Sequence, residues 1–198
     1  MNPKRWRDVL SLGIGTGRFP HELSWLIDNP VRRVLLTPAT LADRLDLKES
    51  ASVLEVGPGS GYFSVELAHR VPQGRLELLD LQPEMLVKAK RKLAAAGCQN
   101  VGFTAHDATS PFPFAAETFD AVILVAVLGE VQDARSCLSA VHHVLRRCGL
   151  LVIHEHIPDP DRIPFTALQP LVEECGYRLR RRWGPFWNYT AIFARLSA

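Results

Sequence analysis

The segment VLEVGPGSG, at residues 53–61, constrains the fold of this chain more than any other. A short apolar run is followed at once by three glycines, Gly57, Gly59 and Gly61. Glycine has no side chain, so such a loop can turn tightly and lets a ligand approach the backbone. Helical spacing resumes after Gly61. The segment therefore predicts a β-strand, a glycine turn and an α-helix in succession.

The same alternation of strand and helix continues along the chain. We predict strands at 52–56, 75–79, 101–105, 121–125, 150–155, 177–183 and 189–196. We predict helices at 61–71, 83–96, 134–147 and 165–175. The strand at 121–125 is apolar throughout, as is typical of a strand covered on both faces. Repeated alternation predicts an α/β fold: a Rossmann-like, doubly wound, mostly parallel sheet with right-handed crossovers.

The last two predicted strands form a hairpin. They are joined by residues 184–188, and five residues are too few for a parallel crossover, so one of the two strands must be antiparallel. If the strand at 177–183 runs parallel to the first five, the hairpin tip lies at the edge of the sheet that binds ligands.

The carboxyl ends of the parallel strands are where ligands of such sheets bind. The second strand ends in Asp80, 23 residues after Gly57, where a carboxylate can accept hydrogen bonds from both ribose hydroxyls of a nucleoside. A dinucleotide is the obvious competitor, but its GxGxxG fingerprint would need a glycine at Tyr62. Glu55 would also repel a pyrophosphate. The pattern favours a nucleoside with an ammonium group and no phosphate.

Four stretches together resemble a known family. They are VLEVGPGSGYFS, LLDLQPEML, HDATSPFPFAAETFDAVILVAVLGEV and HHVLRRCGLLVIHEH. The chain resembles the class I S-adenosylmethionine-dependent methyltransferases, and more closely their small bacterial "type 11" members related to ubiquinone/menaquinone C-methyltransferases. The resemblance runs from about residue 40 to the C-terminus and says little about the acceptor. One departure is Cys148-Gly149, where the family often has Gly-Gly in a turn.

The resemblance implies S-adenosylmethionine as cofactor and S-adenosylhomocysteine as product. It also implies a set of cofactor contacts at the strand ends. Glu55, Gly57, Gly59 and Gly61 would line the methionine and ribose side, Asp80 would hold the ribose, Leu81 would pack on the adenine, Asp107 and Ala108 would contact the adenine edge, and Val125 would lie beside the methionine part. Asp107 also suits a turn, which would be its commoner role if it stood alone.

The acceptor side is less defined. A sulfonium methyl group is already reactive, so the enzyme mainly aligns the acceptor, and a base is needed only if the acceptor must lose a proton. His154, His156 and Glu130 are the candidate catalytic residues. Histidine titrates near neutrality and suits a base, but a structural role for both histidines and a capping role for Glu130 stay open. No third ligand stands at a fixed spacing from the histidines, so we expect no metal.

Two other segments could meet the acceptor. The aromatic residues of the hairpin tip, Phe186, Trp187 and Tyr189, either wall an apolar pocket or pack as in any hairpin. Residues 1–50 read as a helical preamble, in which Thr37 before Pro38 predicts an N-cap. We expect 1–50 to form a lid over the methyltransferase domain at 51–198. Its possible contacts are Phe19, His21 and Trp25.

The composition of the chain limits which classes of binding partner are expected. The net charge is only +2, so a nucleic-acid partner is disfavoured despite the arginines at 178–182. The longest apolar run, 121–129, is about half of a bilayer span, and the first residues lack the pattern of a secretory signal. Four scattered cysteines fit a reducing cytosol. We expect a cytoplasmic protein with no integral membrane segment, either monomer or homodimer.

The leading hypothesis is an enzyme that methylates a small, apolar or aromatic molecule at carbon or oxygen. One alternative is a non-catalytic protein that binds S-adenosylmethionine or S-adenosylhomocysteine as a regulator or scaffold. Another is a nicotinamide-dependent oxidoreductase. The intact glycine loop and Asp80 favour the active methyltransferase.

Overall fold

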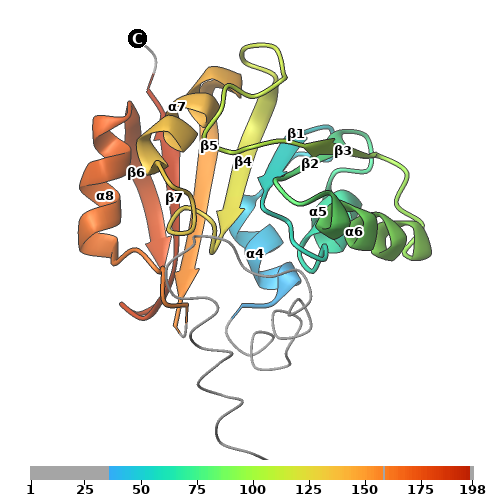
Figure 1. The fold of residues 1–198 in the computed structure, drawn as a ribbon, viewed down its shortest axis with the longest axis horizontal. Coiled ribbons are helices and arrows are strands. Elements are labelled where there is room, and N and C mark those ends of the chain that lie inside the picture. Colours follow the sequence, from blue (N-terminus) through green and yellow to red (C-terminus); the bar gives the residue numbers. More distant parts are fainter. Residues whose placement is uncertain (1–35, 158, 197–198) are drawn as a thin grey trace, which may run out of the picture.

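A computed structural model describes residues 36–157 and 159–196. A seven-stranded sheet of order β3-β2-β1-β4-β5-β7-β6 forms the centre (Figure 1). The strands are β1 (Ser52–Val56), β2 (Arg75–Asp80), β3 (Val101–Ala105), β4 (Phe119–Val125), β5 (Leu145–His156), β6 (Tyr177–Trp183) and β7 (Asn188–Arg195). The described helices are α4 (Pro38–Leu45), α5 (Ser64–Arg70), α6 (Pro83–Ala95), α7 (Ala134–Val144) and α8 (Phe165–Glu174).

Strands β1 to β5 are parallel, and the order of the sheet reverses between β1 and β4. Such a reversal is the switch point at which doubly wound sheets bind ligands. Strand β7 is antiparallel to both β5 and β6, so β6 runs in the direction of β5. The predicted doubly wound sheet with a closing antiparallel hairpin is confirmed.

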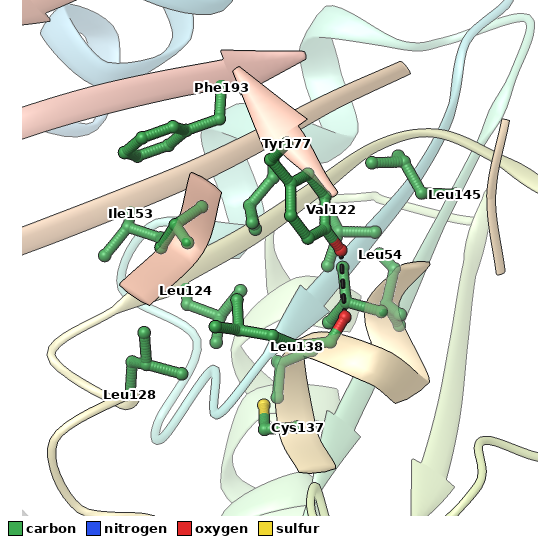
Figure 2. Close-up of a cluster of buried hydrophobic side chains, with 14 of the residues drawn as sticks. Leu54, Val122, Leu124, Leu128, Cys137, Leu138, Leu145, Ile153, Tyr177 and Phe193 are labelled. Carbon is green, nitrogen blue, oxygen red and sulfur yellow. Dashed lines mark hydrogen bonds between the residues drawn. The ribbon is translucent and has the colours of Figure 1, made fainter. Parts of the chain in front are cut away.

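Each face of the sheet is covered by its own helices. On one face Val122, Leu124 and Ile153 belong to a buried cluster with residues of α7 and α8 (Figure 2). There the Tyr177 hydroxyl donates to the Leu138 carbonyl at 2.9 Å, which ties β6 to α7. The other face packs against α4, α5 and α6. Burial on both sides explains why the β4 sequence is apolar at nearly every position.

The predicted helix at 134–147 was wrong at its C-terminal end. Helix α7 ends at Val144, and β5 begins at Leu145 rather than at residue 150. Leu145 is buried and pairs with Phe119, and Arg146 makes an ion pair with Asp120 at 2.5 Å. These contacts between strands override the helical spacing of the local sequence.

Helix α4 is the described part of the N-terminal preamble. The Thr37 hydroxyl accepts a hydrogen bond from the Thr40 backbone N–H at 3.1 Å, with proline at the first helical position, so the predicted N-cap is confirmed. Leu41 and Leu45 are buried in the same cluster as residues of β1 and α5. The lid expected from the rest of the preamble, with Phe19, His21 and Trp25, lies outside the described residues.

Candidate functional site

The glycine turn after β1 needs glycine for two separate reasons. Gly57, Gly59 and Gly61 have φ of +66°, +54° and +82°, a region that side-chain-bearing residues rarely adopt. A Cβ atom on Gly57 would also lie 2.4 Å from Val127 Cγ2. A Cβ on Gly59 would meet no atom of the described residues within 4 Å. The turn is therefore packed on one side and open at Gly59.

Asp80 links this turn to the end of β2. Its side chain is buried, and its Oδ2 accepts from the Gly59 backbone N–H at 3.3 Å. Its Oδ1 accepts from the Gln82 backbone N–H at 2.9 Å. Burial raises the pKa of Asp80, and these backbone hydrogen bonds oppose the rise. The carboxylate is thus fixed beside the open side of the glycine turn, as a ribose-binding acid should be.

The third strand end brings Asp107 to the same edge, since Asp80 pairs with Ala105 across β2 and β3. The Asp107 Oδ1 accepts from both the backbone N–H and the hydroxyl of Thr109, at 2.9 and 2.8 Å. These hydrogen bonds form a turn, which is one of the two roles that the sequence allowed for Asp107. Ala108 is half-buried and Leu81 is exposed. Their roles toward an adenine stay predictions.

Glu55 is buried on β1 and accepts a hydrogen bond from the Ser64 hydroxyl at 2.6 Å. Since Ser64 begins α5, this bond fixes the carboxylate where the glycine turn enters the helix. The carboxylate therefore lies in the strand–turn–helix unit that the sequence predicted.

Val125 and His154 extend the edge toward the C-terminal half of the sheet. They pair across β4 and β5, and His154 pairs in turn with Thr190 of β7. Between Val125 and the Val127 that packs on Gly57, Ala126 has φ of +54°. A non-glycine residue in this region is strained, and strain of this kind concentrates at functional sites.

His154 is held by its neighbours on this edge. The Arg44 guanidinium donates to the Thr190 hydroxyl at 2.6 Å, and that hydroxyl lies 3.0 Å from His154 Nδ1. His156 is also buried, and its ring stacks on that of His154 at 5.5 Å between centroids. Burial lowers the pKa of Arg44. Sequence reasoning missed Arg44 and Thr190, because helix α4 and strand β7 give no local signal that they meet here.

Glu130 is half-buried, and its backbone N–H donates to the Val127 carbonyl in the turn after β4. A second acid, Glu155, was not among the candidates. It is fully buried, and its Oε2 accepts from the Ile163 backbone N–H at 3.3 Å. Within the described residues Oε1 has no hydrogen-bond partner. Burial, with the nearby Asp159 charge, raises the pKa of Glu155 to about 8.

The tip of the β6–β7 hairpin lies at the same edge as the carboxyl ends of the parallel strands, because β6 runs in the direction of β5 (Figure 1). The position predicted for it is confirmed. Tyr189 is fully buried, and its hydroxyl donates to the Ile163 carbonyl at 2.5 Å. Phe186 and Trp187 are instead 73% and 39% exposed. These two side chains are therefore exposed rather than packed into the core.

Among the described residues, no group of three or more His, Cys, Asp or Glu side chains is placed to hold a metal ion. None of the described helices combines the length and the apolar character needed to cross a membrane.

Comparison with known proteins agrees with the geometry. Residues 53–149 match a family model described as "Methyltransferase domain". A phosphatidylethanolamine N-methyltransferase from Cereibacter sphaeroides is 30% identical over 74% of this chain and 67% of its own length. A ubiquinone/menaquinone biosynthesis C-methyltransferase from Roseobacter denitrificans is 31% identical over 73% of this chain. The chain spans only 56% of that relative's length.

The fold is also found among solved structures. A SAM-dependent methyltransferase from Aquifex aeolicus superposes with a TM-score of 0.80 at 22% identity, over 89% of this chain and 98% of that one. Other curated relatives have different acceptors in their names, including a protein-L-isoaspartate O-methyltransferase from Ignicoccus hospitalis. The chain belongs to the class I S-adenosylmethionine-dependent methyltransferases, and S-adenosylmethionine is its cofactor.

Proposed function

We propose that this protein transfers the methyl group of S-adenosylmethionine to a small, apolar or aromatic acceptor. The observation that carries the proposal is the junction of Gly59 with Asp80: an open, left-handed glycine beside a buried carboxylate. A nucleoside bound there gains a carboxylate acceptor for its ribose hydroxyls and close approach to the backbone. S-adenosylmethionine supplies the electrophilic methyl group, and the chain supplies binding and orientation.

In this proposal the contacts divide between two halves of the sheet edge. Glu55, Gly57, Gly59, Gly61, Asp80, Leu81, Asp107, Ala108 and Val125 hold the cofactor. His154, His156 and Glu130 face the acceptor. Because the Thr190 hydroxyl accepts from Arg44, its own proton can be donated to His154 Nδ1. His154 would then be neutral and would present Nε2–H as a donor, a positioning role rather than that of a base.

The names of relatives and the rim of the site bear on the class of acceptor. The names of two relatives, one acting on phosphatidylethanolamine and one in quinone biosynthesis, fit an apolar acceptor, whereas the isoaspartate relative does not. The described part of the acceptor side also carries aromatic residues, Phe186 and Trp187, at its rim. A cytoplasmic setting is part of the proposal, on the ground of the scattered cysteines.

Calorimetry and a transfer assay test the proposal in order. Titration with S-adenosylhomocysteine should show micromolar binding, and NAD⁺ should bind far more weakly. Incubation with methyl-labelled S-adenosylmethionine and a small-molecule extract of a cell lysate should then give a labelled, solvent-extractable product. Label found only in protein would contradict the small acceptor. Tight binding without any transfer would instead support the non-catalytic regulator.

A further inference from the structure

The tip of the β6–β7 hairpin carries Phe186, which has the highest exposed fraction among the large apolar side chains of the described structure. Phe186 is 73% exposed, Trp187 39%, and Ile157 of the neighbouring loop 45%. The Ile157 backbone N–H donates to the Trp187 carbonyl at 2.9 Å, so the three residues are neighbours at the end of the hairpin, which we call the hairpin tip. Exposed large apolar side chains that cluster in this way mark interaction sites.

The strand that leads to the tip is strongly basic. Arg178, Arg180, Arg181 and Arg182 are all exposed on β6, which is the edge strand of the sheet. Six other arginines of the described structure make an ion pair with a carboxylate: Arg70, Arg75, Arg135, Arg146, Arg147 and Arg195. In the part of the chain that the structure describes, none of the four β6 arginines has such a partner. Their charge is available to an anionic surface.

Arginines also lie close to the tip itself. The Arg162 guanidinium donates to the Phe186 carbonyl at 3.0 Å, and Arg181 lies over the Trp183 ring at 5.3 Å. Asp159 and Asp161 of the same loop offset part of this charge. The Asp159 carboxylate accepts from the Asp161 backbone N–H at 3.0 Å within the turn. Aromatic and aliphatic side chains that project beyond a basic rim are the composition of a surface that inserts into a bilayer interface.

We propose that the hairpin tip docks this protein on an anionic membrane surface, with Ile157, Phe186 and Trp187 inserted among the headgroups. Anionic lipid attracts arginines near the bilayer surface, and the apolar tip gives binding that salt alone does not abolish. A nucleic acid fits less well, because its phosphates would engage the arginines and leave the aliphatic Ile157 without a role.

The position of the tip gives docking a consequence. The tip lies at the carboxyl edge of the parallel strands (Figure 1). The glycine turn follows β1 at this edge, and His154 lies near the carboxyl end of β5. A membrane bound there would face the acceptor side of the site, so a membrane-dissolved acceptor could enter without crossing water. The docking itself does not depend on the proposed reaction.

Vesicle flotation with the full chain tests this directly. The probes are vesicles of phosphatidylcholine alone and vesicles that also contain phosphatidylglycerol. The protein should partition to the anionic vesicles at low salt, and Phe186→Ser with Trp187→Ser should lower the partition coefficient about tenfold or more. Val87→Ser is the matched control, since Val87 is 48% exposed on α6, far from the tip. It should leave binding unchanged.

A second pair of variants tests the placement of the charge. Arg181→Glu, near the tip, should weaken binding to anionic vesicles about tenfold, and Arg178→Glu, at the other end of β6, should weaken it less. The proposal is overturned if the wild-type protein ignores anionic vesicles at millimolar lipid, or if the tip variants bind as the wild type does. It is also overturned if RNA displaces the protein from vesicles while the serine variants keep full RNA and vesicle affinity. None of these results bears on S-adenosylhomocysteine binding, which tests the proposed function separately.

Discussion

The two halves of the ligand edge are built in different ways. At the ends of β1 and β2 the geometry comes from the backbone: left-handed glycines, N–H groups that point at Asp80, and a Cβ-sized space filled by Val127. At the ends of β5 and β7 it comes from side chains of distant segments, as in the contact of Arg44 with Thr190. A site built from the backbone needs glycines at fixed positions, which appear in the local sequence. A site built from the side chains of distant segments gives no such local pattern. The sequence therefore predicted the cofactor but did not identify the acceptor.

The largest expected effects come from substitutions of two glycines in one turn, Gly57 and Gly59, which should act in different ways. Gly57→Ala forces both a left-handed backbone and a contact with Val127, and should destabilise the fold by roughly 2–4 kcal/mol. Gly59→Ala meets only the backbone strain, about 1–2 kcal/mol. It should nevertheless abolish S-adenosylhomocysteine binding if the open side holds the cofactor. Thermal melts and calorimetry on both variants give the comparison. Unchanged affinity of Gly59→Ala would place the ligand elsewhere.

Asp80→Asn comes next. The change keeps the shape of the side chain and removes the charge that receives the ribose hydroxyls, so affinity for S-adenosylhomocysteine should fall about 10- to 100-fold. Asp107→Asn retains an oxygen that can accept from Thr109 and should cost affinity without loss of the turn. Calorimetry should show both losses of affinity. The melting temperature of Asp80→Asn should also fall, since an asparagine amide can accept only one of the two backbone N–H groups that Asp80 holds. A loss confined to Asp80→Asn would assign Asp107 to the turn alone.

Glu155 gives the acceptor half its own pH signature. Its pKa is raised to about 8 in the folded protein, above that of an unfolded glutamate, so the folded state binds the extra proton. The contribution of Glu155 to stability should therefore be fully present below the pKa of an unfolded glutamate. It should be lost as pH rises toward about 8, by at most about 1.4 kcal/mol per pH unit. Glu155→Gln should flatten this slope. Urea unfolding at a series of pH values measures it, and an unchanged slope would assign the dependence to another group.

The smallest effects come from two strained residues at opposite edges. Ala126 and Cys148 have φ of +54° and +59°, so replacement by glycine should stabilise each by roughly 0.5–1 kcal/mol. Cys148→Gly should leave methyl transfer unchanged. Ala126→Gly should loosen the segment between Val125 and Val127 and lower kcat. Equal activity of the two variants would show that the strain at Ala126 has no part in the site.

Much of the fold followed from the sequence, because periodicity and turn residues are local. The bounds of β1, β3 and β6 were predicted as found, and Thr37 was recognised as a cap. The start of β5 was missed, because Leu145 is set in a strand by its pairing with Phe119. The sequence favoured His154 and His156 as candidates and not Glu155 between them. The raised pKa of Glu155 arises from its burial beneath a loop, which no local pattern predicts.

The interior place of β7 has a consequence for how the molecule is made. Strand β7 is synthesised after β6 but lies between β5 and β6, so β6 has no partner in the sheet until β7 has joined β5. During translation the apolar edge of β5 therefore stays open until the residues of β7 have left the ribosome. An unpaired strand edge is prone to aggregation. This period, rather than the finished enzyme, is where a chaperone would have most to protect.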